Sequence, residues 1–306
     1  MFRFRKKIEK KYGVIQRKEE KCGFFSYFIT FLGGINYCIE NSLIPVIDMA
    51  SYTNIFQEEN INANSWELFF EQPMGVRIED IEDFREVQYV DCNSILATKR
   101  PNLTMDFMTN EKNIEYWNVI CKKYIRLNAE TQRHVTKFLD EYLPSEIRDE
   151  TVGVLCRGTD YTNLRPYGHP VQPDINDVID KIQEYLDKYN CKYVFVATED
   201  EELCEKLNNV FGDRAIIPNV SRYKNTNNAY LKEIQEEQGN VIMNTRDYLA
   251  SIVALSKCKI LVSGRTSGSI GALVLAEGYQ DVFIWNLGKY GIDDWQTLSE
   301  ALGVNK

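Results

Sequence analysis

The fold is decided by the stretch Thr151-Val-Gly-Val-Leu-Cys156 and by the five residues that follow it, Arg157-Gly-Thr-Asp-Tyr161. The first six residues form an apolar run, which is typical of a strand buried on both faces of a sheet. A second run is Tyr193-Val-Phe-Val-Ala197, and residues 175–189 between the two runs place apolar side chains at the helical period. A buried strand, an amphipathic helix and another buried strand predict a βαβ unit.

The same alternation extends over the rest of the chain. We expect further strands over residues 44–48, 215–217, 259–262 and 282–285. We expect further helices over residues 24–40, 113–127, 128–143, 201–211, 245–258 and 267–277. The sequence therefore predicts an α/β protein of two Rossmann-like domains, residues 1–147 and 148–306, with Pro144 ending the helix before the boundary.

Composition limits the classes of partner. The chain has 306 residues, 44% of them hydrophobic, which is enough apolar surface for two cores. Its formal net charge of -9 argues against nucleic-acid binding. Residues 1–21 nevertheless hold nine Lys or Arg against three Glu, so we expect a solvated helix face there or a peripheral contact with an anionic inner membrane. The apolar stretch 24–38 is too short and too interrupted to span a bilayer.

Cysteine and histidine usage indicates a cytoplasmic protein without a metal. Eight cysteines are scattered with no Cys-x-x-Cys pair, so we expect buried, reduced thiols. The two histidines, His134 and His169, leave no zinc ligands at usable spacing. No Asp-x-Asp pair is present to hold Mg²⁺, and no metal is expected.

Polar residues follow four of the predicted strands, at the edge where open parallel sheets bind their ligands. Ser263-Gly-Arg-Thr-Ser-Gly-Ser269 opens a helix, and the free amides and the dipole of a helix N-terminus suit a phosphate. Arg157 on the adjoining strand adds a guanidinium that matches a diphosphate, and Asp160 either orients it or receives ligand hydroxyls. The alternative for the turn is a plain strand-to-helix connection. A guanidinium consumed by an internal ion pair would count against this site.

Two common nucleotide-binding devices are missing. The chain has no G-x-x-x-x-G-K-[ST] loop, and Gly264, Gly268 and Gly271 have the wrong spacing for the dinucleotide fingerprint. An NAD(P)-dependent oxidoreductase is therefore disfavoured, although it stays an alternative.

Three segments, in order and at matching spacing, resemble the fucosyltransferase superfamily that includes core α-1,6-, nodulation and bacterial α-1,2-fucosyltransferases. Val152–Tyr161 resembles its His-x-Arg-x-x-Asp motif, Tyr193–Asp200 its second motif, and Ile252–Ser263 with Thr266-Ser267 its third. The resemblance implies a GT-B fold, with parallel sheets facing a central cleft. It also implies inverting, metal-independent transfer from a GDP-sugar donor, GDP-fucose above all, to a glycan or lipid-linked glycan in bacterial surface polysaccharide synthesis.

The resemblance also implies a set of site residues. The candidate catalytic residues are Arg157, Asp160 and Asp48. The candidate donor-binding residues lie at strand ends or on the elements that follow them: Arg157, Tyr161, His169, Thr198, Glu199, Asp200, Asp247, Ser263, Arg265, Thr266, Ser267, Gly268 and Ser269. His169 is equally a plain loop histidine, and Asp247 equally a structural residue of its helix.

Two positions depart from the family's first motif, and Ser251 stands where the third motif of core fucosyltransferases has an aspartate, with Asp247 one turn earlier on the same face. Leu155 stands where the motif has histidine, and Gly158 where several members have a second arginine. These departures make a GDP-sugar a firmer expectation than GDP-fucose. They also leave open a catalytically inactive nucleotide- or carbohydrate-binding protein.

Overall fold

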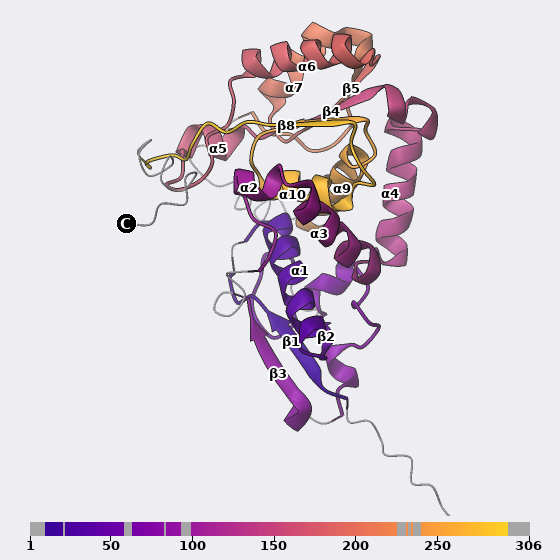
Figure 1. The fold of residues 1–306 in the computed structure, drawn as a ribbon, viewed down its shortest axis with the longest axis vertical. Coiled ribbons are helices and arrows are strands. Elements are labelled where there is room, and N and C mark those ends of the chain that lie inside the picture. Colours follow the sequence, from indigo (N-terminus) through magenta and orange to yellow (C-terminus); the bar gives the residue numbers. More distant parts are fainter. Residues whose placement is uncertain are drawn as a thin grey trace, which may run out of the picture. The chain divides into compact units, whose positions relative to one another are not determined.

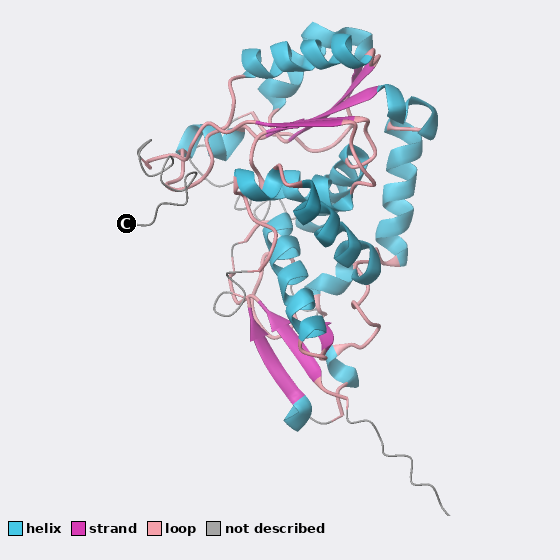
Figure 2. Ribbon diagram, viewed as in Figure 1, coloured by secondary structure: helices cyan, strands magenta, loops and turns pink. Residues whose placement is uncertain are grey.

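The computed structural model describes residues 10–20, 22–57, 63–82, 84–92, 99–224, 231, 234 and 240–292. The chain divides into two compact units, and both are α/β (Figures 1 and 2). The first unit is Met1–Pro101 with Val119–Thr131, and the second is Asn102–Asn118 with Gln132–Lys306. The domain boundary that the sequence predicts near residue 147 stays a prediction.

The second unit is built on a sheet of five parallel strands in the order β6-β5-β4-β7-β8. The strands are β4 (Thr151–Cys156), β5 (Tyr193–Thr198), β6 (Ala215–Ile216), β7 (Ile260–Ser263) and β8 (Asp281–Ile284). Leu155 of β4 pairs with Ala197 of β5 and with Ser263 of β7. The carboxyl end of β4 therefore lies between the carboxyl ends of β5 and β7.

Helices cover both faces of this sheet (Figure 1). One face is covered by α6 (Ile175–Tyr189) and α7 (Glu201–Phe211), the other by α9 (Val241–Leu255) and α10 (Ser267–Leu275). The core between the sheet and α6 is mostly aliphatic and includes Val152, Val154, Ile182, Leu186, Val194, Val196, Ile260 and Val262. Burial on two faces explains why these strands are continuous apolar runs in the sequence.

The first unit is built on three parallel strands in the order β2-β1-β3. They are β1 (Tyr12–Gln16), β2 (Ile44–Ile47) and β3 (Val87–Asp91), and α1 (Phe24–Glu40) packs on β1 and β2. Part of its core is aliphatic, with Val14, Val46 and Ile81 in one cluster, and part is aromatic. The aromatic part includes the contacting rings of Phe24, Phe25, Tyr27, Phe28, Phe31, Phe56, Trp66, Phe69 and Phe70.

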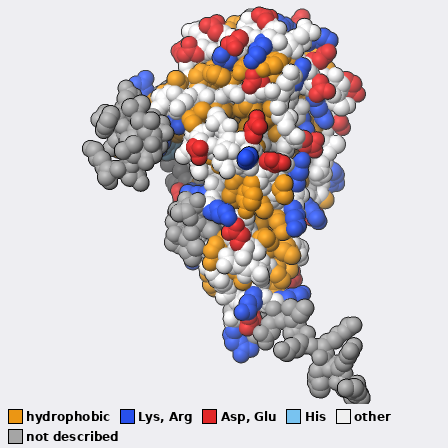
Figure 3. Space-filling view, in the orientation of Figure 1, with side chains coloured by type: hydrophobic (Ala, Val, Ile, Leu, Met, Phe, Trp, Pro, Cys, Tyr) orange, Lys and Arg blue, Asp and Glu red, His pale blue; other side chains and the backbone are white. Residues whose placement is uncertain are grey.

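The remaining helices lie along the chain between β3 and α6 or are short 3₁₀ helices. The α-helices are α2 (Met105–Met108), α3 (Glu111–Tyr124), α4 (Ala129–Tyr142) and α5 (Thr159–Leu164). Single 3₁₀ turns are Ser65–Leu68, Ile78–Asp80, Phe84–Glu86, Ser145–Glu150 and Gly212–Arg214. On the face drawn in Figure 3, acidic and basic side chains are interspersed over α6 and α7, where Lys181 pairs with Glu184.

The structure confirms several elements and corrects one. The ranges predicted for α1, β4, α6 and α7 are those observed. A helix face at residues 1–21 is wrong over Tyr12–Gln16, which form the central strand of the first sheet; residues 1–9 and 21 lie outside the described residues. All eight cysteines are buried, and no disulfide joins any of them among the described residues, as expected. Within the described ranges, every helix is too short or too polar to cross a bilayer.

Candidate functional site

Three charged side chains meet at the carboxyl ends of β4 and β5, and we call them the Arg157 cluster: Arg157, Asp160 and Glu199. Arg157 Nη2 donates a hydrogen bond of 3.0 Å to Asp160 Oδ1, and Nη1 lies 3.6 Å from Glu199 Oε2. Parallel pairing of β4 with β5 brings these groups together although Glu199 is far along the chain. This contact favours the orienting role expected of Asp160, which stays a prediction.

The ion pairs count against a ligand role for Arg157, but they leave much of the guanidinium unused. The side chain is 22% exposed. A guanidinium has five N–H donors. Among the described residues, the only hydrogen bond that Arg157 donates goes to Asp160. The N–H donors that no described residue accepts can still donate to the oxygens of a diphosphate.

Burial and charge shape the protonation of the Arg157 cluster. Burial acts to lower the pKa of Arg157, but the carboxylates of Glu199 and Asp160 together raise the pKa above its ordinary value. Burial raises the pKa of Glu199, and the charge of Arg157 counters only part of that rise. With both carboxylates ionised, the cluster has one more negative than positive charge.

The loop after β4 is held by the carboxylates at the end of β5. The amide of Gly158 donates to Glu199 Oε1 at 3.0 Å, and the amide of Thr159 donates to Asp200 Oδ2 at 2.9 Å. A Cβ on residue 158 would lie 2.3 Å from Asp200 Oδ2. The loop therefore needs glycine at Gly158, which explains why a second arginine is not accommodated here.

The turn between β7 and α10 uses most of its side chains internally. The hydroxyls of Ser263 and Thr266 each lie 2.7 Å from that of Ser269, which also donates to the carbonyl of Gly264. Ser263 and Ser269 are fully buried, and Thr266 caps α10 by accepting the amide of Ser269. Ser267 keeps a partly exposed side chain. The amides of Ser267 and Gly268, in the first turn of α10, have no acceptor among the described residues.

Tyr248 on α9 lies against this turn, and the sequence did not single it out. A Cβ on Gly268 would lie 2.2 Å from the Tyr248 hydroxyl oxygen, so the phenol abuts the first turn of α10. The charges of Arg157 and Glu199 both act on the phenol. A glycine in the first turn of a helix is the sequence signal for such a close approach.

The aromatic and basic candidates lie around the same edge of the sheet. The Arg157 guanidinium carbon is 5.1 Å from the ring centroid of Tyr161, and the ring centroid of His169 lies 5.3 Å from that of Tyr161. Arg265 is buried and donates to the carbonyl of Gly288 at 2.8 Å. The hydroxyl of Thr198 accepts the Asp200 amide. The structure thus brings Tyr161 and His169 to the Arg157 cluster, while Arg265 and Thr198 support the backbone.

Asp247 contacts a different element. Its Oδ1 lies 2.8 Å from Nε2 of His134 on α4. Burial raises the pKa of Asp247, and His134 acts in the opposite direction. No contact joins Asp247 to the Arg157 cluster within the described part of the chain, and its donor-binding role stays a prediction.

Asp48, in the first unit, is enclosed by hydrogen bonds. Its Oδ2 accepts from Gln16 Nε2 and from the Ser51 hydroxyl, both at 2.6 Å, and its Oδ1 accepts from the amides of Ala50 and Ser51. We call Asp48, Gln16 and Ser51 the Asp48 cluster. Asp48 is only 3% exposed. Its expected catalytic role stays a prediction, and the contacts favour a structural one.

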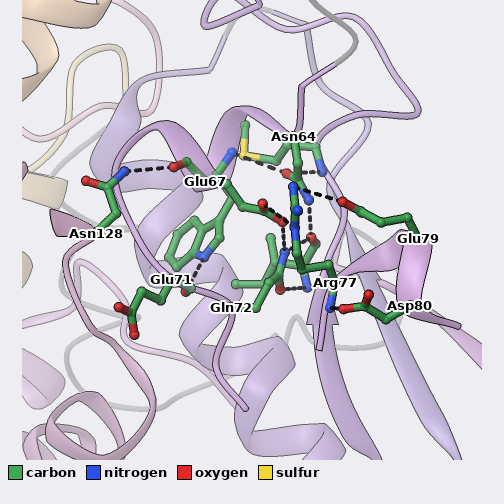
Figure 4. Close-up of polar contacts among 11 residues, drawn as sticks. Asn64, Glu67, Glu71, Gln72, Arg77, Glu79, Asp80 and Asn128 are labelled. Atoms are coloured by element: carbon green, nitrogen blue, oxygen red, sulfur yellow. Dashed lines mark hydrogen bonds and ion pairs between the residues drawn. The ribbon is translucent and has the colours of Figure 1, made fainter. Parts of the chain in front are cut away.

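Polar side chains beside the Asp48 cluster are also used inside the first unit, as Figure 4 shows. Gln72 both accepts from the amide and donates to the carbonyl of Ile47, at the end of β2. Glu67 accepts from Gln72 and from Arg77, at 3.0 and 2.9 Å. This edge of the first sheet is therefore tied together by its own side chains.

No protein-family model and no curated protein matches the sequence. Solved structures do match the fold. A FUT1 variant from Arabidopsis thaliana, in complex with GDP, is 12% identical with a TM-score of 0.54, over 94% of this chain and 72% of that chain. POFUT1 in complex with GDP-fucose is 11% identical with a TM-score of 0.53, over 93% and 99%.

A third match is NodZ α-1,6-fucosyltransferase co-crystallised with GDP, which is 14% identical with a TM-score of 0.51, over 88% of this chain and 93% of that chain. The resemblance to fucosyltransferases is thereby confirmed at the level of the fold. The chain has a GT-B fold of two α/β units with parallel strands, as the sequence predicts.

Proposed function

We propose that the chain is a glycosyltransferase that moves fucose or a related sugar from a GDP-sugar to an acceptor hydroxyl, with inversion and without a metal ion. The donor binds in the second unit, at the carboxyl ends of β4, β5 and β7. The acceptor is a glycan or lipid-linked glycan in bacterial surface polysaccharide synthesis, and the reaction is cytoplasmic. In this proposal the basic residues 1–21 contact the inner membrane.

The observation that carries the proposal is the Arg157 cluster. A partly exposed arginine side chain stands at the carboxyl ends of β4 and β5, with N–H donors that no described residue accepts and with two carboxylates that orient it. Three structures of the same fold were solved with GDP or GDP-fucose. A nucleoside diphosphate is the ligand that suits both observations.

The residues of this site stabilise the leaving group of the reaction, the nucleoside diphosphate. The bond between the anomeric carbon and the diphosphate oxygen breaks ahead of attack by the acceptor hydroxyl, so negative charge grows on the diphosphate. Arg157 and the amides of Ser267 and Gly268 stabilise that charge. Asp160 is a positioning residue for Arg157, because its carboxylate is 4% exposed and already accepts the guanidinium.

A second candidate, a nucleotide-binding protein without catalysis, is favoured by one observation. Arg157 is ion-paired within the protein, and a diphosphate must compete with Asp160 and Glu199 for it. Such a protein binds GDP but does not turn over a donor.

The first experiment separates the candidates by ligand. Thermal shift with GDP, GDP-fucose, GDP-mannose, UDP and NAD⁺ is expected to show stabilisation by the guanine nucleotides. Stabilisation by NAD⁺ alone would overturn the proposal in favour of an oxidoreductase.

The second experiment measures donor hydrolysis or transfer, with equal rates expected in EDTA. Arg157→Ala is expected to lower the rate by about 10²- to 10³-fold, as for other donors to a developing anion. The matched control is Arg214→Ala, since the acceptors of Arg214 among the described residues are the carbonyls of Lys192 and Cys191, at the amino end of β5. GDP binding by the wild type with no turnover of any GDP-sugar would favour the binding-only candidate.

A further inference from the structure

Arg17 follows β1 directly and is held against α1. Its Nη1 donates to the hydroxyls of Ser26 and Thr30, at 2.8 and 2.7 Å. Its Nε and Nη2 donate to Glu19 Oε2, at 3.0 and 2.7 Å, and the side chain is 12% exposed. The charge of Arg17 therefore stands at the carboxyl end of the central strand of the first sheet, the edge where open parallel sheets bind their ligands.

A second arginine, Arg100, lies on the same side of α1. A Cβ on Gly33 would lie 2.8 Å from Cβ of Arg100 and 3.2 Å from the carbonyl oxygen of Lys99. The missing side chain at Gly33 thus admits residues 99–100 against the helix. Thr30, which accepts from Arg17, precedes Gly33 by one turn, so both arginines contact one face of α1.

The contacts of these arginines leave a positive charge at this edge. Glu19 is the carboxylate that acts on both, and its hydrogen bonds are with Arg17. In the described part of the chain, no group accepts a hydrogen bond from Arg100, which is partly exposed. Burial raises the pKa of the Cys92 thiol to about 12, so this neighbour of Arg100 is neutral. Two guanidiniums and one carboxylate sum to a net charge of about +1.

The charged form of Arg100 is disfavoured in the free protein. Burial lowers the pKa of Arg100, the charge of Arg17 lowers it further, and Glu19 acts in the opposite direction. A bound oxyanion would oppose both lowering effects and would supply the acceptor that Arg100 lacks among the described residues. Arg100 is therefore placed better for a complex with an anion than for the free protein.

We infer that the first unit has an oxyanion-binding site at Arg100 and Arg17, which holds a phosphate or carboxylate group of the acceptor. Arg100 supplies hydrogen bonds, since a guanidinium fork matches either group. Arg17 supplies mainly charge, because its own N–H groups are largely used within the protein. The anion site stands by itself, whereas its assignment to the acceptor rests on the proposed function and narrows the acceptor to an anionic glycan.

The test is a thermal-shift titration with inorganic phosphate and with glucuronate, at constant ionic strength. Arg157→Ala is the background, because it removes the guanidinium proposed to bind phosphate in the second unit. Adding Arg100→Met, which keeps an apolar stem, should weaken binding about tenfold, as expected for lost hydrogen bonds between charged groups. Adding Arg100→Lys should cause a smaller loss, because the charge remains and the fork is lost. The probe that loses affinity identifies the group, phosphate or carboxylate.

The matched control is Lys11→Met in the same background. Lys11 is exposed and precedes β1, so the variant removes one positive charge from the opposite end of the same strand. Affinity for both probes should stay unchanged. A loss equal to that of Arg100→Met would mean that net charge alone is responsible, and would overturn the site.

The outcomes separate this inference from the proposed function. Equal affinity for both probes with and without Arg100→Met, or no binding of either probe in the Arg157→Ala protein, overturns the inference and leaves the proposed function standing. Arg100→Met alone should bind GDP as the wild type does, and a tenfold loss of GDP affinity would overturn the assignment to the acceptor. Failure of the wild type to bind GDP overturns the proposed function, while the phosphate and glucuronate titrations still decide the anion site.

Discussion

The two parallel sheets end in polar clusters of opposite character. In the Asp48 cluster a carboxylate that is 3% exposed accepts four hydrogen bonds from its own unit. In the Arg157 cluster a guanidinium that is 22% exposed donates one hydrogen bond among the described residues. Both clusters follow buried strands, and both contain a charged residue that the sequence singled out.

A charged side chain at the end of a strand can stabilise the fold or bind a ligand, and the two clusters differ in which role their contacts favour. A buried carboxylate with every acceptor position filled stabilises the fold, because removing it leaves several donors unpaired. A partly exposed guanidinium with spare donors contributes less to the fold and keeps capacity for a ligand. Saturation by hydrogen bonds, rather than position at a strand end, therefore distinguishes the two roles.

The largest expected effect is on the Asp48 cluster. Asp48→Ala should lower the free energy of unfolding by about 3 kcal/mol, because four donors lose their acceptor. GDP affinity of the folded protein should not change. Chemical denaturation followed by titration with GDP at low temperature checks both statements, and a tenfold loss of GDP affinity would show that Asp48 acts on the ligand.

The next effect concerns the geometry of the Arg157 cluster. Arg157→Lys keeps the charge but loses the planar fork, so GDP affinity should fall about tenfold while the free energy of unfolding changes by about 1 kcal/mol or less. Isothermal titration with GDP measures the first quantity and urea denaturation the second. Equal affinity in the lysine variant would mean that Arg157 is not a bidentate donor.

A smaller effect is expected from pH. Because the pKa of Glu199 is raised by burial, this carboxyl takes up its proton before exposed carboxylates do as pH falls. The neutral form removes a negative charge beside Arg157, so GDP-mannose binding should strengthen as the pH falls through the raised pKa of Glu199. A GDP-sugar is the better probe since its diphosphate keeps a constant charge over this range.

The control for the pH effect is Glu199→Gln, whose amide oxygen can still accept from Gly158 and Thr159. Its affinity for GDP-mannose should match the low-pH value of the wild type and vary little with pH. A pH profile that is the same in the variant and the wild type would assign the titration to another group.

The smallest effect is expected at a contact that belongs to neither cluster. Asp247→Asn should lower the free energy of unfolding by about 1 kcal/mol, because it weakens a partly exposed pair with His134. GDP affinity should stay at the wild-type value. Reduced affinity with unchanged stability would return Asp247 to the donor site, as the family resemblance implies.

How much of the fold could be predicted differs between the two units. Strands β4, β5 and β7 are buried on both faces, so each is a visible apolar run. In contrast, β1 buries Val14 and Ile15 within a segment rich in Lys and Arg, and Gln88, Tyr89 and Asp91 of β3 are exposed. Two branched apolar side chains are too short a pattern to indicate a strand, although four of the five residues of β1 are buried; pairing with β2 and β3 makes it one.

The candidate site could be predicted where neighbouring strands bring its parts together. The contact of Arg157 with Asp160 is local, and parallel pairing of β4 with β5 adds Glu199. Contacts between helices could not be predicted in this way, because no pairing of neighbouring strands indicates which helix residues meet. Tyr248 meets Gly268 through helix packing, and Asp247 meets a histidine that is 113 positions away along the chain.

The most direct measurement is a crystal structure with GDP bound. We expect the diphosphate to lie within hydrogen-bond distance of the Arg157 guanidinium and of the amides of Ser267 and Gly268. Asp48 should keep its four hydrogen bonds within the protein. A GDP molecule bound elsewhere, with Arg157 still ion-paired to Asp160 and Glu199 alone, would contradict the claim that the Arg157 cluster is the diphosphate site.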